Sequence, residues 1–272
     1  GLDPTVHIGG RLDALGGGSR VGKKDVFVAE ACEFHGSFLE MHPTVAVVLN
    51  IDADHLDYYK DIEHIERAFG QFLSLLPPDG VALGWGEDAR IMRLFGKLSC
   101  ERRTFGLGRE NDYHPEDLSY SDTGCPRYDV VFRGEKLCRV ELKVAGSFNV
   151  INSLAAFAAA HVAGAPAGEI AASLSHFAGV HRRFEFTGLI DQVKMYHDYG
   201  HNPAEMRAAL SVARQQHPRR LWAVMQPHTY SRVKSLFQDY LTCTQIADYT
   251  LVTDIFAARE KDPGDIKAEM IV

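Results

Sequence analysis

A short apolar strand that runs into a polar cluster places the strongest constraint on the fold. Residues 45–49 are rich in valine and leucine, which is typical of a buried strand. The chain continues directly into Asn50, Ile51, Asp52, Ala53, Asp54 and His55. In open α/β sheets, ligands bind in the crevice beyond the carboxyl ends of the strands. The segment therefore indicates either a metal–nucleotide site or a loop built from Asx turns and a helix cap.

Strands alternate with helices along much of the chain, which predicts an α/β fold with βαβ units and a parallel sheet. Helical patterns cover residues 62–76, 149–163, 166–177, 203–216 and 233–246. Strand-like runs cover residues 25–30, 81–83, 193–196, 221–225 and 249–253. Residues 102–142 are β-rich, with a hairpin signal at residues 133–136. We predict two domains, at residues 1–187 and 188–272.

Composition excludes several functional classes. The 272 residues are 46% hydrophobic and 24% charged, as in a soluble globular protein with a sizeable core. A net charge of −7 without a long basic run argues against nucleic-acid partners and against anionic membranes. No apolar stretch approaches the roughly 18–20 residues that span a bilayer. The five cysteines form no C-x-x-C pair, which indicates a reduced, cytoplasmic compartment.

Residues 17–24 match the beginning of a phosphate-binding loop, G-x-x-x-x-G-K, but lack its context. Lys24 stands where such a loop carries the Ser or Thr that holds magnesium. No strand is predicted before the segment, and a strand instead of a helix is predicted after it, so we interpret it as a surface turn. The chain starts without Met and ends inside a predicted element. We therefore expect a piece of a longer protein.

Polar side chains of the first predicted domain suggest a metal and a base. Glu30 and His55 follow two strands that we predict to be neighbours, and a carboxylate with an imidazole can hold Mg²⁺ or Mn²⁺. Alternatively, His55 has a structural or capping role. The amides of Asn149 and Asn152 can hydrogen-bond a base edge, or Asn149 can be the N-cap of its helix.

Further polar clusters occupy the domain junction and the second domain. Arg182 and Arg183 suit phosphate, because a guanidinium group can bind it bidentately, or they form an interdomain salt bridge. Three segments follow predicted strands: His197–Pro203 with Asp198 and His201, Gln226–Arg232 with His228, and the segment from Asp254. Several polar clusters at one sheet edge indicate a ligand site.

Taken together, these motifs resemble the Mur ligases, the ATP-dependent amide-forming enzymes of peptidoglycan synthesis. The resemblance covers essentially the whole chain. It rests on Val28-Ala29-Glu30, Asn50-Ile51-Asp52-Ala53-Asp54-His55, Asn149-x-x-Asn152, Arg182-Arg183-Phe184, Asp198-Tyr199-Gly200-His201-Asn202-Pro203, Gln226-Pro227-His228-x-Tyr230-Ser231-Arg232 and Asp254-Ile255-Phe256-Ala257-Ala258-Arg259-Glu260.

The resemblance implies a fold, cofactors and substrates. The fold would be a central P-loop-type ATPase domain without its phosphate loop, followed by a truncated Rossmann-like C-terminal ligase domain. The cofactors would be ATP and Mg²⁺ or Mn²⁺. The reaction would join L-alanine to UDP-N-acetylmuramate through an acyl phosphate, in the cytoplasm. Without the phosphate loop, we expect the chain alone to be inactive.

The resemblance also implies roles for nine residues. The residues that would bind metal or ATP are Glu30 and His55 (metal), Asn149 and Asn152 (adenine), Arg183 (phosphates) and Asp198 (ribose). The residues that would lie near the incoming amino acid and the acyl phosphate are His201, His228 and Arg232. There they would stabilise developing negative charge. Phe148 and Thr229 depart from the pattern of many members and receive no role.

Three alternatives remain open. The first is another Mur-type or folylpolyglutamate-type ligase, which the segments around His228 and Asp254 disfavour. The second is a metal-dependent hydrolase that uses Glu30, His55, His197 and His201, which needs at least three ligands on one ion. The third is a non-catalytic module that only binds nucleotide.

Overall fold

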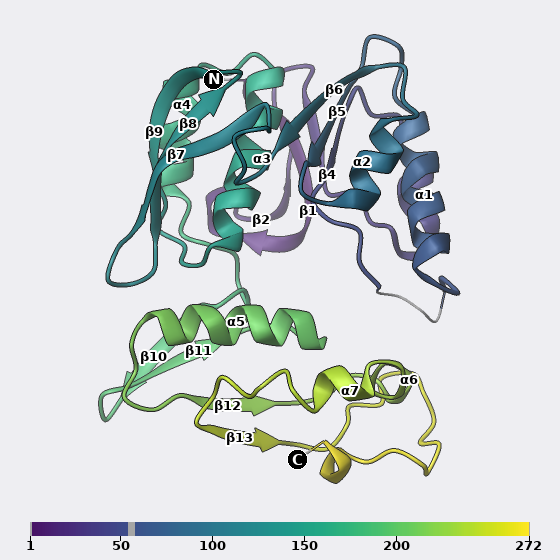
Figure 1. The fold of residues 1–272 in the computed structure, drawn as a ribbon, viewed down its shortest axis with the longest axis vertical. Coiled ribbons are helices and arrows are strands. Elements are labelled where there is room, and N and C mark those ends of the chain that lie inside the picture. Colours follow the sequence, from purple (N-terminus) through teal and green to yellow (C-terminus); the bar gives the residue numbers. More distant parts are fainter. Residues whose placement is uncertain (1, 54–57, 272) are drawn as a thin grey trace. The chain divides into compact units, whose positions relative to one another are not determined.

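The computed structural model describes residues 2–53 and 58–271, so His55 lies outside the described residues. The chain divides into two compact units (Figure 1). One consists of Gly1–Ser121 and Cys125–Ala178, and the other of Asp122–Gly124 and Gly179–Val272. The domain boundary at residue 187 stays a prediction. Within the described residues, no helix has the length and apolar character needed to cross a bilayer.

A six-stranded mixed sheet forms the centre of the first unit, in the order β4-β5-β6-β7-β8-β9. Its strands are β4 (Val45–Val48), β5 (Val81–Trp85), β6 (Glu101–Phe105), β7 (Tyr113–Tyr120), β8 (Pro126–Phe132) and β9 (Glu135–Glu141). The pairs from β4 to β7 are parallel, whereas β7–β8 and β8–β9 are antiparallel. The predicted hairpin is confirmed, with Arg133 and Gly134 as its two-residue turn.

Helices cover both faces of this sheet, as expected for parallel strands. They are α1 (Ile62–Ser74), α2 (Ala89–Phe95), α3 (Phe148–Val162) and α4 (Ala167–His176) (Figure 1). Along β5, the buried Val81 and Leu83 belong to the core that contains α3, and Ala82 belongs to the core that contains α1 and α2. A Cβ on Gly84 would lie 2.5 Å from Ile91 Cγ2, so α2 packs directly on the β5 backbone.

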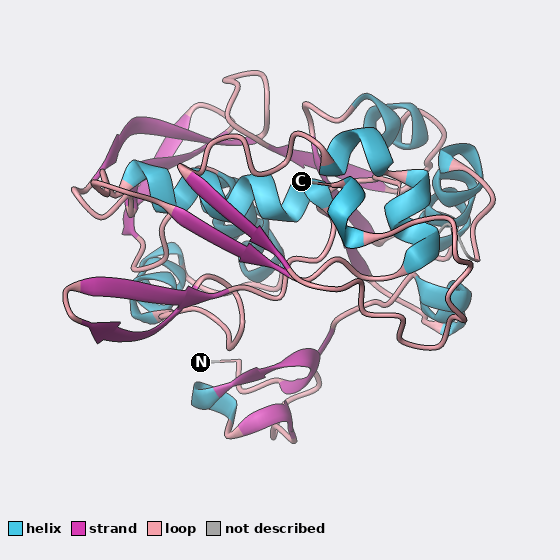
Figure 2. Ribbon diagram, turned by 90° about the horizontal axis from the view of Figure 1, so that it is seen from below, coloured by secondary structure: helices cyan, strands magenta, loops and turns pink. Residues whose placement is uncertain are grey.

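A separate three-stranded sheet, in the order β2-β1-β3, lies near the N-terminus (Figure 2). Its strands are β1 (Thr5–Leu12), β2 (Gly17–Arg20) and β3 (Phe27–Ala29). The segment that matches a phosphate-loop pattern therefore begins as strand β2, antiparallel to β1. The segment does not have the strand–loop–helix structure of a phosphate-binding loop. It is not only the surface turn that we predicted, because part of it is a strand, and strand β1 precedes it.

The strand that leads to Glu30 does not neighbour the strand that leads towards His55, so that prediction is wrong for the described strands. Strand β3 pairs with β1, whereas β4 is the edge of the six-stranded sheet. The physical reason is that β1 supplies the parallel backbone partner of β3, from Thr5↔Phe27 to His7↔Ala29.

The second unit contains two two-stranded sheets and three α-helices among its described residues. Its elements are β10 (Glu185–Ile190), β11 (Val193–His197), α5 (Pro203–Gln215), β12 (Trp222–Met225), α6 (Tyr230–Ser235), α7 (Phe237–Tyr240) and β13 (Tyr249–Val252). The parallel pairing is confirmed for β12 and β13. It is wrong for β11, which pairs antiparallel with β10 through Asp191 and Gln192, both at positive φ. The single helix predicted at residues 233–246 is two short helices, because the backbone of Leu236 leaves the helical conformation.

Short 3-10 segments complete the described structure. They span Asp13–Leu15, Phe34–Glu40 and Ala268–Met270.

Candidate functional site

Three loops of the second unit follow the carboxyl ends of β11, β12 and β13, and each contributes an aromatic or imidazole ring. The rings of His201 and His228 meet with centroids 5.3 Å apart. The ring of Phe256 stacks on the ring of His228, with the two centroids 5.6 Å apart. A parallel backbone bridge also joins His228 to Phe256. The structure thus brings together two of the three residues predicted to be catalytic.

Arg232, the third of these residues, lies in α6 and contacts His228 twice. Its Nη1 lies 3.1 Å from His228 Nδ1 and donates to the carbonyl oxygen of His228 at 3.1 Å. A guanidinium group only donates, so the first contact assigns an unprotonated Nδ1 to His228. Burial, followed by the positive charges of His201 and Arg232, lowers the pKa of His228 below its ordinary value. A neutral imidazole with Nδ1 as the acceptor carries its proton on Nε2, from which it can donate a hydrogen bond.

Asp198, predicted to bind ribose, organises the chain around it. Its Oδ2 accepts from the backbone N–H of Phe184 at 2.8 Å, and its Oδ1 accepts from that of Gly200 at 2.6 Å. Each carboxylate oxygen has a second lone pair, so the group retains acceptor capacity. These bonds connect the Arg183–Phe184 segment to the loop that carries His201.

Glu205 is a residue whose role sequence reasoning missed. Its Oε2 accepts from the backbone N–H groups of His201 at 2.9 Å and Asn202 at 3.3 Å, and Asn202 Oδ1 accepts from Glu205 N at 2.9 Å. This capping box opens α5. Arg183 Nη1 lies 3.8 Å from Glu205 Oε1. The Asn202-x-x-Glu205 spacing was the available signal for the cap.

Tyr240 supports the same loop from α7 and gave no signal in the sequence. Its buried hydroxyl donates to the carbonyl oxygen of His201 at 2.7 Å. Burial raises the pKa of Tyr240 to about 12, so the hydroxyl keeps its proton at neutral pH. The position of His201 is therefore fixed through its backbone.

In the first unit, the two asparagines predicted to face adenine lie in the first turns of α3. Asn149 Nδ2 donates to the carbonyl oxygen of Ala145 at 2.7 Å, and Asn152 Nδ2 donates to Asn149 Oδ1 at 3.4 Å. Ser147 occupies the N-cap position, so the alternative in which Asn149 is the N-cap is wrong. Asn152 is exposed, which leaves its amide accessible to a ligand.

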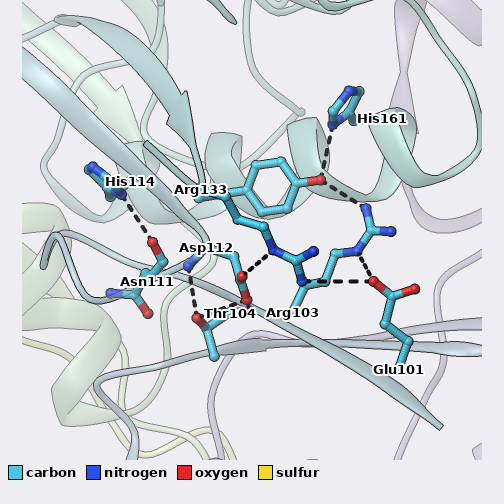
Figure 3. A network of polar contacts seen from close by, with 9 residues as sticks. Glu101, Arg103, Thr104, Asn111, Asp112, His114, Arg133 and His161 are labelled. Carbon is cyan, nitrogen blue, oxygen red and sulfur yellow. Dashed lines mark hydrogen bonds and ion pairs between the residues drawn. The ribbon is translucent and has the colours of Figure 1, made fainter. Parts of the chain in front are cut away.

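The far end of α3 is held by a polar network whose residues lie mainly in β6, in β7 and in the loop between them (Figure 3). The buried Tyr113 hydroxyl lies 3.0 Å from His161 Nδ1, near the end of the helix, and accepts from Arg103 Nη1 at 3.3 Å. Arg103 pairs with Glu101 at 2.7 Å. Burial, and then the charge of Arg103, lowers the pKa of His161. We interpret this network as structural support for the helix that carries Asn149.

Glu30, predicted to bind metal, uses one of its oxygens within the small sheet. Its Oε2 accepts from the backbone N–H of Gly9 at 2.7 Å. Within residues 2–53 and 58–271, no group of three or more His, Cys, Asp or Glu side chains converges as a metal site. The hydrolase alternative stays untested, because its residues come from both units and His55 lies outside the described residues.

Two family models match the chain in sequence order. The model described as Mur ligase middle domain matches residues 19–160. The model described as Mur ligase, glutamate ligase domain matches residues 182–272.

Curated relatives match almost the whole chain. It is 43% identical over 271 residues to the UDP-N-acetylmuramate–L-alanine ligase of Acetivibrio thermocellus, covering 99% of this chain and 58% of that protein. It is 41% identical over 272 residues to the protein of the same name from Caldanaerobacter subterraneus, covering 100% of this chain and 59% of that protein. The chain thus spans under two thirds of the length of these relatives.

Solved structures agree with the fold. The crystal structure of UDP-N-acetylmuramate-alanine ligase from Thermotoga maritima matches with a TM-score of 0.74 and 26% identity, covering 94% of this chain and 56% of that one. The murein peptide ligase from Psychrobacter arcticus matches with a TM-score of 0.68 and 24% identity, covering 92% of this chain and 57% of that one. The second match supports the fold alone.

Proposed function

Because the chain belongs to the Mur ligase family, we propose that it forms the ATP-binding and amino-acid-binding parts of an enzyme that joins L-alanine to UDP-N-acetylmuramate. The observation that carries the proposal is the meeting of His201, His228 and Arg232 beyond the ends of β11 and β12. Two family models that match the chain in sequence order support the proposal. So do the relatives named UDP-N-acetylmuramate–L-alanine ligase, which match nearly the whole chain.

The charges of this cluster suit acyl transfer. ATP would phosphorylate the carboxylate of the sugar, and the amine of alanine would attack the acyl phosphate. The tetrahedral intermediate and the departing phosphate concentrate negative charge, which the guanidinium of Arg232 can stabilise. The neutral imidazole of His228, whose Nδ1 faces Arg232, can donate a hydrogen bond from Nε2 to the same negatively charged oxygen atoms. His201 would help to place the amino acid.

Four residues are proposed to contact ATP. The exposed amide of Asn152, braced by Asn149, offers both a donor and an acceptor to adenine. The exposed guanidinium of Arg183 suits phosphate. Asp198 keeps acceptor capacity for ribose hydroxyls beyond its two backbone bonds.

Glu30 fits a magnesium ion in its chemistry. Carboxylate oxygen is a preferred ligand of Mg²⁺, and no hydrogen bond from a described residue occupies Glu30 Oε1. His55 is proposed as the second ligand on the family resemblance alone, with Mn²⁺ as the other candidate ion. When bound, the metal would neutralise charge on the ATP phosphates.

The compartment proposed is the cytoplasm. The five cysteines, all within the described residues, are free thiols. Free cysteines are typical of a reducing compartment.

An assay on the complete product of the gene tests the proposal. We expect phosphate release and an alanine-bearing product only when ATP, UDP-N-acetylmuramate and L-alanine are all present. Glycine, D-glutamate and diaminopimelate, each supplied in place of alanine, test the other ligases. Preference for one of them, or for a folate, would replace the proposal with another member of the superfamily. Hydrolysis that needs metal but no ATP would favour the hydrolase.

A further inference from the structure

Glu260 joins the loop after β13 to the beginning of α6. Its carboxylate accepts from Thr229 Oγ1 at 2.7 Å, from the backbone N–H of Ser231 at 2.9 Å and from the hydroxyl of Ser231. Burial alone would raise the pKa of Glu260, but the bonds from Ser231 and Thr229 hold it below its ordinary value. The group is therefore an anion at neutral pH, half-buried and fully engaged by one short stretch of chain.

These bonds replace a missing helix cap. Thr229 is the N-cap residue of α6, yet its side chain accepts no hydrogen bond from the helix. The N–H of Ser231 is one of the backbone donors that a helix leaves without an internal partner. Glu260 satisfies that donor from a separate loop. Because α6 has only six residues, its position depends on such tertiary contacts.

The residue next to Ser231 is Arg232, and Arg232 makes both contacts to His228. An anion at Glu260 would repel the phosphate and carboxylate that Arg232 is proposed to attract. A role in supporting the stretch is therefore more consistent with its charge than a role in binding substrate.

We propose that Glu260 is a positioning residue, which fixes the beginning of α6 and thereby the geometry between Arg232 and His228. This inference rests on the proposed function, because it gives those two residues their role. In this role Glu260 acts through Ser231 and not through contact with substrate or ATP.

A neighbouring ion pair supplies a matched control. Lys234, also on α6, pairs with Asp265 at 2.6 Å. The pair joins the same helix to the same C-terminal segment, but it contacts neither Arg232 nor His228. Asp265→Asn therefore removes another carboxylate that contacts α6, and it leaves the hydrogen bonds of Glu260 in place.

The first test needs no ligase activity. Glu260→Ala, Glu260→Gln and Asp265→Asn are compared by ¹H–¹⁵N spectra of the Arg232 Nε–H and of the His228 ring in the complete gene product. We expect Glu260→Ala to shift both signals, because the cap is lost. Glu260→Gln should restore them in part, because its amide oxygen can still accept from Ser231 N. Asp265→Asn should leave both signals in place.

A second variant removes hydrogen-bond donors to Glu260 instead of Glu260 itself. Thr229→Val combined with Ser231→Ala removes two of the three bonds and leaves Glu260 in place. We expect the Arg232 and His228 signals to shift as they do in Glu260→Ala. Unchanged signals in this double variant would overturn the proposal, even where Glu260→Ala fails to fold.

Kinetics of the complete gene product give the second readout. Glu260→Ala should lower kcat/KM for alanine roughly tenfold, the scale expected when a partner that orients a functional residue is lost. The KM for ATP should stay unchanged, and Glu260→Gln should recover part of the loss. Wild-type kinetics in Glu260→Ala would overturn the inference. A wild-type enzyme without alanine-dependent activity would instead overturn the proposed function, while the spectra still decide the role of Glu260.

Discussion

The imidazole rings of His201 and His228 meet at an interplanar angle of 65°, although they follow strands that belong to different sheets. Strand β11 pairs with β10, and β12 pairs with β13. Sheet register therefore does not set this contact. Hydrogen bonds from side chains do: Tyr240 holds the backbone of His201, and Arg232 holds His228.

Arg232→Lys should harm the complete enzyme more than its conserved charge suggests. Lysine replaces the planar guanidinium group, which has several N–H donors, with a single ammonium group. It therefore cannot keep the hydrogen bonds to His228 Nδ1 and to the His228 carbonyl oxygen and also bind the substrate. We expect a loss of about 2–4 kcal/mol of transition-state stabilisation, the scale of one oxyanion-hole donor. Steady-state kinetics should show it in kcat/KM for alanine, with ATP affinity nearly unchanged.

Arg207→Lys is the control for that substitution, because Arg207 makes an exposed ion pair with Asp239 at 3.4 Å. Exposed pairs contribute little, so this variant should behave as wild type. A silent Arg232→Lys, or one that acts only through ATP, would refute the placement of the amino-acid site.

His228 should titrate below its ordinary value of 6.5, because burial and then the charges of His201 and Arg232 disfavour its protonated form. The native state binds this proton less readily than the unfolded state. Its contribution to stability is therefore complete above pH 6.5 and is lost as the pH falls through 6.5 towards the native pKa. The shift of the ring Hε1 proton with pH measures the native pKa. Arg232→Met should raise that pKa, and a native value above 6.5 would contradict the prediction.

Asn152→Ala should weaken ATP binding without loss of stability. The side chain is exposed, and a lost neutral hydrogen bond costs about 1 kcal/mol, which corresponds to roughly a fivefold rise in Kd for ATP. Asn149→Ala should also lower the free energy of unfolding, because Asn149 holds the carbonyl of Ala145. Isothermal titration and urea unfolding separate the two effects. Equal ATP affinity of wild type and Asn152→Ala would remove this residue from the adenine site.

The bond between Tyr128 and Ser153 should be a source of non-additive stability in the first unit. The buried Tyr128 hydroxyl lies 2.6 Å from Ser153 Oγ, which itself donates to the Asn149 carbonyl at 2.6 Å. Ser153→Ala leaves a buried hydroxyl without its acceptor and should cost about 1–3 kcal/mol, whereas Tyr128→Phe should cost roughly 0.5–1.5 kcal/mol. Urea unfolding of the double variant should show less destabilisation than the two single variants added together. Strict additivity would mean that the hydroxyls do not interact.

Much of the fold could be predicted where local signals agree. Helix α1 begins at the predicted Ile62, where Asp61 is its N-cap, and ends at Ser74, two residues before the predicted end and shortly before Pro77. The β8–β9 hairpin was predictable from Arg133 and Gly134, because glycine suits the left-handed second position of its turn. The β10–β11 hairpin was missed because its turn residues, Asp191 and Gln192, lack that glycine.

The side chains that meet in the candidate site could be named from the sequence, and their contacts with ligands stay a prediction, but the residues that support them could not be named. Histidines and arginines after predicted strands are visible in one sequence. The bonds of Tyr240 to His201, and of Glu260 to Ser231, join positions 39 and 29 residues apart. No local pattern encodes such pairs, because they exist only after the chain has folded.

The mixed six-stranded sheet also sets an order of assembly. Strands β8 and β9 are joined by a two-residue turn. The connection between the parallel strands β4 and β5, which pair Val45 with Val81, is much longer because it contains α1. Short loops close at lower entropic cost, so the antiparallel half should fold early and the parallel half late. The Phe105↔Tyr113 pair is the only β6–β7 register pair in the described sheet, so the late half docks onto the early half through a narrow seam. Chains that stall before this docking would leave the backbone N–H and C=O groups on the β6-facing edge of β7 unpaired, where a strand of another chain could pair with them.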